Sequence, residues 1–348
     1  MKLQTLCKAT FILLFIPFYP LNGQVNRCVL NLIKAQEQFS AGQIEEIPEL
    51  LLDCIEKGFS PEDRIEAFKL LINAYIFDGF PDLAEKHMII FLNEYPEYQV
   101  KEDDPYEFVV LFEQFDNHPR YSIGSFTGIN FNSVMVTQPF GVYNVNEVKA
   151  DYSGIPGFQI GAGFNYYLNP KLEVSAEAMF VKSGFDYEVK PFPFTTTQYS
   201  ERYARIELPV SLLYAFHAKQ ISPYLRMGMH SSLLISASGE SVRSYSNTGG
   251  VDINDISGNR KVITKDRNLF NLSPFVGTGA RYKLTRAYMF LDVRYHFGLI
   301  PQVLPETRHD ARNDDIWLFY HQQDDFTLNM LSISLGYVRV FYNPRRKN

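Results

Sequence analysis

Gly157–Tyr167 reads GFQIGAGFNYY, and apolar side chains occupy every second position of this stretch. The apolar set is Phe158, Ile160, Ala162, Phe164 and Tyr166, and between them lie Gln159, Gly161, Gly163 and Asn165. Successive side chains of a β-strand point to opposite faces. One face of this segment is therefore apolar and the other is small or polar. A soluble sandwich shows the same alternation, so the number and length of such segments must decide between the two.

The same alternation recurs along the chain from Tyr121 onward. Seven further segments carry it: 123–131, 172–180, 205–214, 225–230, 270–284, 291–297 and 331–337. Strands of about ten residues match a tilted crossing of the outer membrane better than a soluble sandwich. The sequence therefore predicts an all-β domain over 119–348, an eight-stranded antiparallel transmembrane barrel.

The connections alternate in length, which predicts an orientation. Three are short, at 169–170, 217–220 and 283–286, and four are long, at 132–156, 186–199, 237–267 and 300–325. Short periplasmic turns opposite longer extracellular loops are typical of outer-membrane barrels. Both ends of the barrel domain then face the periplasm. An aromatic girdle is expected at that end from Tyr121, Tyr166, Phe216, Tyr224, Tyr282, Tyr288 and Phe341.

The predicted inward faces carry a balanced set of charges. The carboxylates are Glu173, Glu177, Glu207 and Asp292, and the guanidinium groups are Arg205, Arg226, Arg281 and Arg294. An eight-stranded barrel is just wide enough for side chains to fill, and an unpaired buried charge is costly. We therefore expect a lumen charge network that plugs the barrel. The alternative is an unpaired polar lining around water.

The N-terminal 23 residues have the pattern of a signal peptide. Two lysines precede the short apolar run Ala9–Tyr19, and Gly23 offers a small residue for cleavage. The run is too short to span a bilayer as a helix, although a retained anchor is the alternative. A signal peptide over 1–23 places the mature chain outside the cytoplasm.

Residues 25–117 change to a period near 3.6 and predict a small all-α domain. Ser60 followed by Pro61 marks a helix start, and glycines separate the helices. The helix–turn–helix spacing is close to that of tetratricopeptide (TPR) repeats, which predicts a TPR-like helical-hairpin domain in the periplasm. Such hairpins often bind peptide segments, and a simple spacer domain is the alternative. Cys28 and Cys54 are expected to form a disulfide in an oxidising compartment, with two free thiols as the alternative.

Charge separates the two parts of the chain. Residues 25–118 hold 20 acidic and 7 basic side chains, a net charge of −13, whereas residues 119–348 carry a net charge of +5. The acidic part is either a set of solvated helix faces or a docking surface for a basic partner. Nucleic acid is disfavoured, because a phosphate-binding surface needs positive charge.

The sequence offers little for catalysis. It has no phosphate-binding loop or nucleotide motif, and no cofactor is expected. His230 and Ser231 are neighbours in a strand and point to opposite faces, so they do not form a nucleophile–base pair. The acidic cluster of His309, Asp310, Asp314 and Asp315 could hold a hard cation, but such loop clusters are usually solvated. We expect no enzyme, no metal site and no catalytic residue.

Tyr203–Phe216 (YARIELPVSLLYAF), together with Ser222–Leu225 (SPYL), resembles the PorT-like outer-membrane β-barrel proteins of Bacteroidota. The resemblance covers about residues 121–343. It implies an outer-membrane barrel, and some members of that group serve protein export or surface assembly. It implies no catalytic residue, and the helical N-terminal domain departs from the simplest members.

These observations lead to three functional hypotheses for a protein of the Gram-negative outer membrane, embedded in its lipid. The first is a non-enzymatic accessory subunit of a protein export or outer-membrane assembly complex, which docks protein partners through its periplasmic helical domain. The second is a surface receptor or adhesin that acts through the long extracellular loops. The third is a lipid hydrolase.

Overall fold

The computed structural model describes residues 27–216, 220–245, 254–308 and 314–347. The predicted signal peptide lies outside these residues. The chain forms two compact units, which are considered separately. The helical unit extends to Phe91 and includes Val100–Glu113, and the barrel unit comprises Leu92–Gln99 and the chain from Gln114 onward.

Five helices build the N-terminal region of the described chain. They are α1 (Arg27–Ser40), α2 (Ile47–Lys57), α3 (Pro61–Phe77), α4 (Pro81–Glu94) and α5 (Tyr106–Glu113). Ser60 caps α3, and its side chain accepts a hydrogen bond from the Asp63 amide at 3.2 Å. Gly79 adopts a φ of 79°, which lets the chain reverse between α3 and α4. No helix among the described residues combines the length and apolar character needed to cross a membrane.

A disulfide between Cys28 and Cys54 joins α1 to α2, so the predicted pairing is confirmed. The Cα atoms are 5.5 Å apart and the sequence separation is 26 residues. Closing a loop of this length stabilises the folded state by about 3 kcal/mol. Gly58 lies against the bridge, and a Cβ atom there would lie 2.2 Å from Cys28 Sγ. The close approach of the backbone to the disulfide thus requires glycine at this position.

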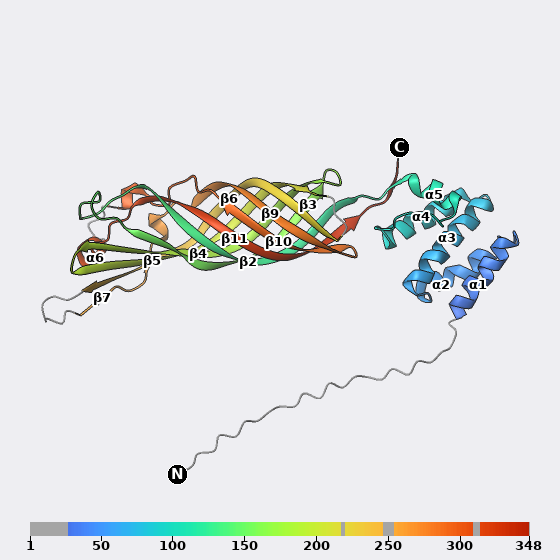
Figure 1. The fold of residues 1–348 in the computed structure, drawn as a ribbon, viewed down its shortest axis with the longest axis horizontal. Helices are drawn as coiled ribbons and strands as arrows, with labels where there is room; N and C mark the ends of the chain where they lie inside the picture. The colour runs from blue at the N-terminus through green and yellow to red at the C-terminus, as the bar shows by residue number, and fades with distance from the viewer. Residues whose placement is uncertain (1–26, 217–219, 246–253, 309–313, 348) are drawn as a thin grey trace, which may run out of the picture. The chain divides into compact units, whose positions relative to one another are not determined.

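Eight long strands of the described chain form a closed antiparallel ring (Figure 1). In ring order, β5, β4, β3 and β2 are followed by β11, β10, β9 and β6, and β6 pairs with β5 to close it. The eight-stranded barrel with a helical region before it is therefore confirmed. The strands are β2 (Pro119–Gln138), β3 (Asp151–Tyr167), β4 (Leu172–Phe192), β5 (Thr195–Ala215), β6 (Ile221–Tyr245), β9 (Phe270–Leu284), β10 (Ala287–His296) and β11 (Asp325–Tyr342).

The two ends of the barrel differ in their connections. The short connections 168–171, 216–220 and 285–286 define what we call the turn end, and the other four define the loop end. The predicted long loop at 186–199 is wrong, because β4 and β5 continue through it and only Pro193 and Phe194 separate them. Likewise β6 continues to Tyr245 inside the predicted loop 237–267. The connections from β6 to β9 and from β10 to β11 carry short elements: β7 (Ile256–Ser257), β8 (Lys261–Val262), η1 (Thr264–Asp266), η2 (Pro305–Thr307) and α6 (Asp314–Phe319).

On the strands β4 and β5, only the half near the turn end faces lipid. On β4 the outward positions are apolar from Leu172 to Phe180 and then become charged at Lys182, Asp186, Glu188 and Lys190. On β5 they are apolar from Tyr214 to Ile206, and Arg202 follows. These apolar stretches have about the length of a membrane-crossing strand, roughly 9–11 residues. The rest of β4, β5 and β6 extends beyond the lipid-facing band.

The extended half of the barrel has its own packed interior. Phe185, Tyr187, Tyr199, Tyr203 and Phe326 form its aromatic centre, together with Val189, Leu234, Ala237, Ile263, Val303 and Leu328. Each of these side chains is less than a tenth exposed. The loop end is therefore a folded structure in which strands and loop residues share one core.

Two short strands in the barrel unit involve the ends of its chain. β1 (Phe115–Asp116) pairs with β12 (Arg345–Arg346), and the Lys347 amide donates to the Gln114 carbonyl at 2.7 Å. The last barrel strand ends at Tyr342. The basic residues after it thus continue the backbone pairing at the turn end.

Candidate functional site

The lumen charges begin at the turn end with Glu173 on β4 and Arg281 on β9. Arg281 donates to both carboxylate oxygens of Glu173, at 2.8 Å for Nη2 to Oε2. Its guanidinium lies over the rings of Tyr224 and Tyr288, 5.0 and 4.6 Å from their centroids. These tyrosines were expected in the aromatic girdle, and that prediction is wrong, because they are 2% and 7% exposed and point into the lumen. Tyr121, Tyr166, Phe216 and Tyr282 are exposed at this end.

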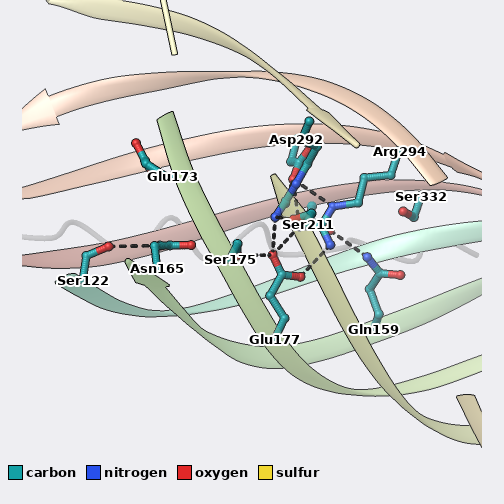
Figure 2. A network of polar contacts seen from close by, with 12 residues as sticks. Ser122, Gln159, Asn165, Glu173, Ser175, Glu177, Ser211, Asp292, Arg294 and Ser332 are labelled. Carbon is teal, nitrogen blue, oxygen red and sulfur yellow. Dashed lines mark hydrogen bonds and ion pairs between the residues drawn. The ribbon is translucent and has the colours of Figure 1, made fainter. Parts of the chain in front are cut away.

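Four charges meet in the middle of the lipid-spanning half (Figure 2). Arg294 donates to both oxygens of Glu177, at 2.5 and 2.9 Å, and its Nε donates to Asp292 Oδ2 at 2.8 Å. Arg226 donates from Nη2 to Glu177 Oε1 at 2.7 Å and from Nη1 to Asp292. Ser211 accepts a further bond from Arg226 at 3.0 Å. Two carboxylates and two guanidinium groups thus form a neutral cluster, which we call the central cluster.

Because the members of the central cluster are buried, each charge depends on the others for its stability. Asp292 is fully buried and Arg294 is 1% exposed. Removing such ions from water costs several kcal/mol for each, and close opposite charges offset this cost only when all partners are present. The loss of any one member therefore leaves an uncompensated charge in the barrel wall.

Arg205 and Glu207 were expected in the same network, but they lie nearer the loop end. Glu207 Oε2 is 2.9 Å from His230 Nε2, and His230 Nδ1 is 3.3 Å from Nδ1 of His296. Arg205 donates to Gln302 Oε1 at 2.7 Å, in the connection between β10 and β11. The eight predicted residues therefore fall into three groups along the lumen.

The buried ion pair of Arg267 with Glu201 was not predicted from the sequence. Arg267 donates from Nε and Nη2 to the two oxygens of Glu201, at 2.6 and 2.7 Å, and both residues are at most 1% exposed. Glu201 precedes the segment predicted as a strand, and Arg267 lies in the segment predicted as a loop. The signal was present, because Tyr199, Glu201 and Tyr203 occupy every second position ahead of Arg205.

Little space remains between these side chains. A cavity of about 30 Å³ lies beside Glu177, Arg226, Arg281 and Tyr224, enough for about two water molecules at roughly 10–15 Å³ each. The lumen is filled by side chains, as the small diameter of eight strands allows.

A family model described as an outer membrane protein beta-barrel domain matches residues 112–302. The chain belongs to this outer-membrane β-barrel family. The matched region contains the strands β2 to β10 and most of the lumen charges. No curated protein matches the chain.

Several solved structures are similar to this outer-membrane barrel. Neisserial surface protein A is 13% identical with a TM-score of 0.30, covering 64% of this chain and 97% of that one. OprG from Pseudomonas aeruginosa is 12% identical with a TM-score of 0.35, at 64% and 97% coverage. Ail of Yersinia pestis is 13% identical with a TM-score of 0.27, at 64% and 99% coverage. At such identities the similarity concerns the fold alone.

The chemistry that this outer-membrane barrel displays is charge compensation. His230 and Ser332 lie on either side of His296, with Ser332 Oγ 3.5 Å from His296 Nε2, and all three are buried. A hydroxyl there contacts neither lipid nor solvent. Among the described residues, no three His, Cys, Asp or Glu side chains are grouped so as to hold a metal ion. His309 and Asp310 lie outside them, as do the side chains of Asp314 and Asp315.

Burial also shifts acidity at the loop end, above the membrane. Asp324 follows α6 and accepts hydrogen bonds from the Phe140 amide at 2.6 Å and from the Tyr152 hydroxyl at 2.6 Å. Removal from water raises the pKa of the Asp324 carboxyl, and these bonds and Arg308 act in the opposite direction. Asp324 thus links Phe140, in the connection after β2, to Tyr152 on β3.

Proposed function

We propose that this protein is a non-enzymatic accessory subunit of a protein export or outer-membrane assembly complex. The barrel is its anchor, and the helical unit holds a protein partner in the periplasm. The observation that carries this proposal is the filled, charge-compensated lumen, which suits an anchor better than a transporter. Opening a path through the lumen would separate the members of the central cluster and leave buried charges without partners. The resemblance to PorT-like proteins supports a role in export.

The helical unit supports docking through exposed apolar side chains at one turn. Phe77, Phe80 and Leu83 are 54%, 50% and 37% exposed and lie around the reversal at Gly79. Phe39 packs against Phe77, with ring centroids 5.8 Å apart. We call Phe77, Phe80 and Leu83 the apolar corner. Exposed apolar groups clustered among charged residues mark interaction sites, and the acidic surroundings favour a partner with basic residues at its rim.

Serine in place of both Phe77 and Phe80 is expected to reduce partner recovery at least tenfold, because the aromatic contact area is lost. The measurement is a crosslinked pull-down from intact outer membranes, with the partner quantified against the barrel. Val262→Ser is the control, since Val262 is 82% exposed but lies at the loop end. If deletion of residues 25–117 left every co-purifying protein in place, the docking proposal would fail.

Cysteine labelling tests the orientation. A membrane-impermeant maleimide is expected to label Val262→Cys in intact cells and Glu62→Cys only after the outer membrane is permeabilised. Both positions are exposed, Cys28 and Cys54 are held in the disulfide, and Cys7 lies in the predicted signal peptide. Labelling of Glu62→Cys in intact cells would contradict the periplasmic placement of the helical unit.

The second candidate is a surface receptor or adhesin that acts through the loop end. The observation that favours it is the packed extension of β4, β5 and β6 beyond the lipid-facing band. Deletion of the connection 246–269 would then abolish ligand binding, whereas truncation of the helical unit would leave it unchanged. A lipid hydrolase ranks third, and retained activity of a Ser232→Ala variant would count against it.

A further inference from the structure

Arg243 lies near the end of β6, with its side chain on the inner face of the extended barrel. It is 8% exposed and enclosed by two tyrosines. Its guanidinium carbon lies 5.1 Å from the ring centroid of Tyr245 and 4.4 Å from that of Tyr320. Nη2 donates to the Tyr245 hydroxyl. Aromatic faces on two sides attract the cation but do not neutralise it.

Arg243 and Arg205 differ from the other buried arginines because neither pairs with a carboxylate among the described residues, and Arg205 donates instead to Gln302. Arg226, Arg267, Arg281 and Arg294 each pair with a carboxylate. Within the part of the chain that the structure describes, Arg243 has no such partner, and its Nε and Nη1 are buried without an acceptor. A buried, uncompensated guanidinium is strongly unfavourable. An anion from outside the chain would supply the missing charge.

A second donor faces the same side of the adjacent strand. Thr197 and Thr195 on β5 lie opposite Arg243 and Tyr245 in the register. Thr195 is 2% exposed, and its Oγ1 has no hydrogen-bond partner among the described residues. Thr197 Oγ1 instead donates to the Phe319 carbonyl at 2.6 Å. The Thr195 hydroxyl is thus a neutral donor without a partner among the described residues. It lies two positions along β5 from Thr197, which pairs with Arg243.

Aromatic residues at the rim form a cover for this position. Tyr320 has a φ of 56°, a conformation that a residue with a Cβ rarely adopts and that is often found at binding sites. Its ring meets that of Phe192 edge to face at 5.6 Å, and Phe192 stacks on Phe194 at 5.8 Å. Phe192 and Phe194 are 38% and 48% exposed. Flat apolar faces therefore stand next to the cation.

The height of the site limits its ligand. Ile235 is the last exposed apolar side chain on β6. Arg243 lies eight residues beyond Ile235, roughly 20 Å further along a tilted strand. The site therefore lies beyond the lipid-facing band, and its ligand binds outside the hydrocarbon of the membrane.

We propose that Arg243 is the centre of a binding site for an oxyanion carried on a sugar ring, a phosphate or a carboxylate. The guanidinium and the Thr195 hydroxyl bind the oxyanion, and the rings of Tyr320 and Phe192 contact the sugar. This site goes beyond the proposed docking function, because it lies at the loop end and does not involve the helical unit.

Calorimetric titration of the full-length protein in detergent micelles tests the site. The probes are glucose 6-phosphate, glucuronate, inorganic phosphate and uncharged glucose. We expect glucose 6-phosphate or glucuronate to bind, inorganic phosphate to bind more weakly, and glucose to leave no signal. Arg243→Gln should weaken binding at least tenfold and Thr195→Val severalfold. Arg260→Gln is the matched control, because Arg260 is exposed at the same end and pairs with Glu240.

Thermal unfolding without ligand separates binding from a structural role. Because Arg243 is uncompensated in the free protein, Arg243→Gln should melt at or above the wild-type temperature while it loses the ligand-induced increase. Wild-type protein that binds none of the charged probes at millimolar concentration would overturn the proposal. So would an Arg243→Gln variant that binds as the wild type does, or one that melts well below it.

Discussion

Replacing Arg294 with methionine is expected to lower the free energy of unfolding by about 3–5 kcal/mol, the cost of breaking a buried ion pair from one side. Arg294 holds both oxygens of Glu177 and one of Asp292. Methionine fills similar volume, so the loss comes from charge and not from a cavity. The measurement is urea unfolding of the protein in lipid vesicles, followed by circular dichroism and by the heat-dependent shift in gel mobility.

Two variants make this result specific. Arg260→Met removes an arginine whose partner Glu240 is also exposed, so it should change the same free energy by only about 0–1 kcal/mol. Adding Asp292→Asn to Arg294→Met restores equal numbers of positive and negative charges, and should recover part of the loss. A single Arg294→Met variant as stable as the wild type would show that the central cluster does not hold the barrel together.

Arginine in place of Leu208 is expected to destabilise the barrel by about 2–4 kcal/mol. Leu208 is 52% exposed on the outward face of β5, midway between Tyr214 at the turn end and Arg202 beyond the lipid-facing band. A charge at this depth must leave water for hydrocarbon. The vesicle unfolding assay described above gives the size of the effect.

Depth provides the control for this substitution. Tyr214→Arg lies on the same strand and face but near the turn end, where the cost falls to about 0–1 kcal/mol because the side chain reaches the interface. Equal effects at Leu208 and Tyr214 would contradict the assignment of the lipid-facing band to the turn-end half of the barrel.

The lipid-spanning half of the barrel could be predicted because its two faces meet different surroundings. Lipid outside and polar groups inside impose a sharp alternation, as in Gly157–Tyr167. Beyond the lipid-facing band, the outward face of the strands becomes polar and the inward face becomes partly aromatic. The outward positions of β5 become Arg202, Ser200 and Gln198, and the inward ones include Tyr199 and Tyr203. The alternation typical of lipid-facing strands therefore ends before 186–199, and its absence there predicts a loop.

The faces of the lumen residues could be predicted, but not their partners. Alternation places Arg205 and Arg226 on the inner face, yet it says nothing of how far along the barrel each one lies. That height depends on the strand tilt and register, which set Arg226 against Glu177 and Arg205 against Gln302. Gln302 comes from a connection whose fold has no periodic signal. Long-range partners of this kind are invisible in a local pattern.

The misplaced girdle residues show a different failure. Tyr224 is in phase with Arg226, and Tyr288 is in phase with Asp292. Their position two and four residues from known lumen charges would have placed them inside. The phase of the alternation therefore decides the face of an aromatic residue, and its distance from the turn end does not. Both tyrosines instead serve as faces for the Arg281 cation.

The seam between β2 and β11 has a consequence for the order of assembly. It pairs Pro119–Gln138 with Asp325–Tyr342, so the ring closes only when the first and last long strands of the barrel meet. Contacts between such distant segments form slowly, because the chain loses the entropy of loop closure before the new contacts stabilise the fold. Until then β2 and β11 are open edges that can pair with other chains. Pairing of the final strand thus determines when the folding protein ceases to be prone to aggregation.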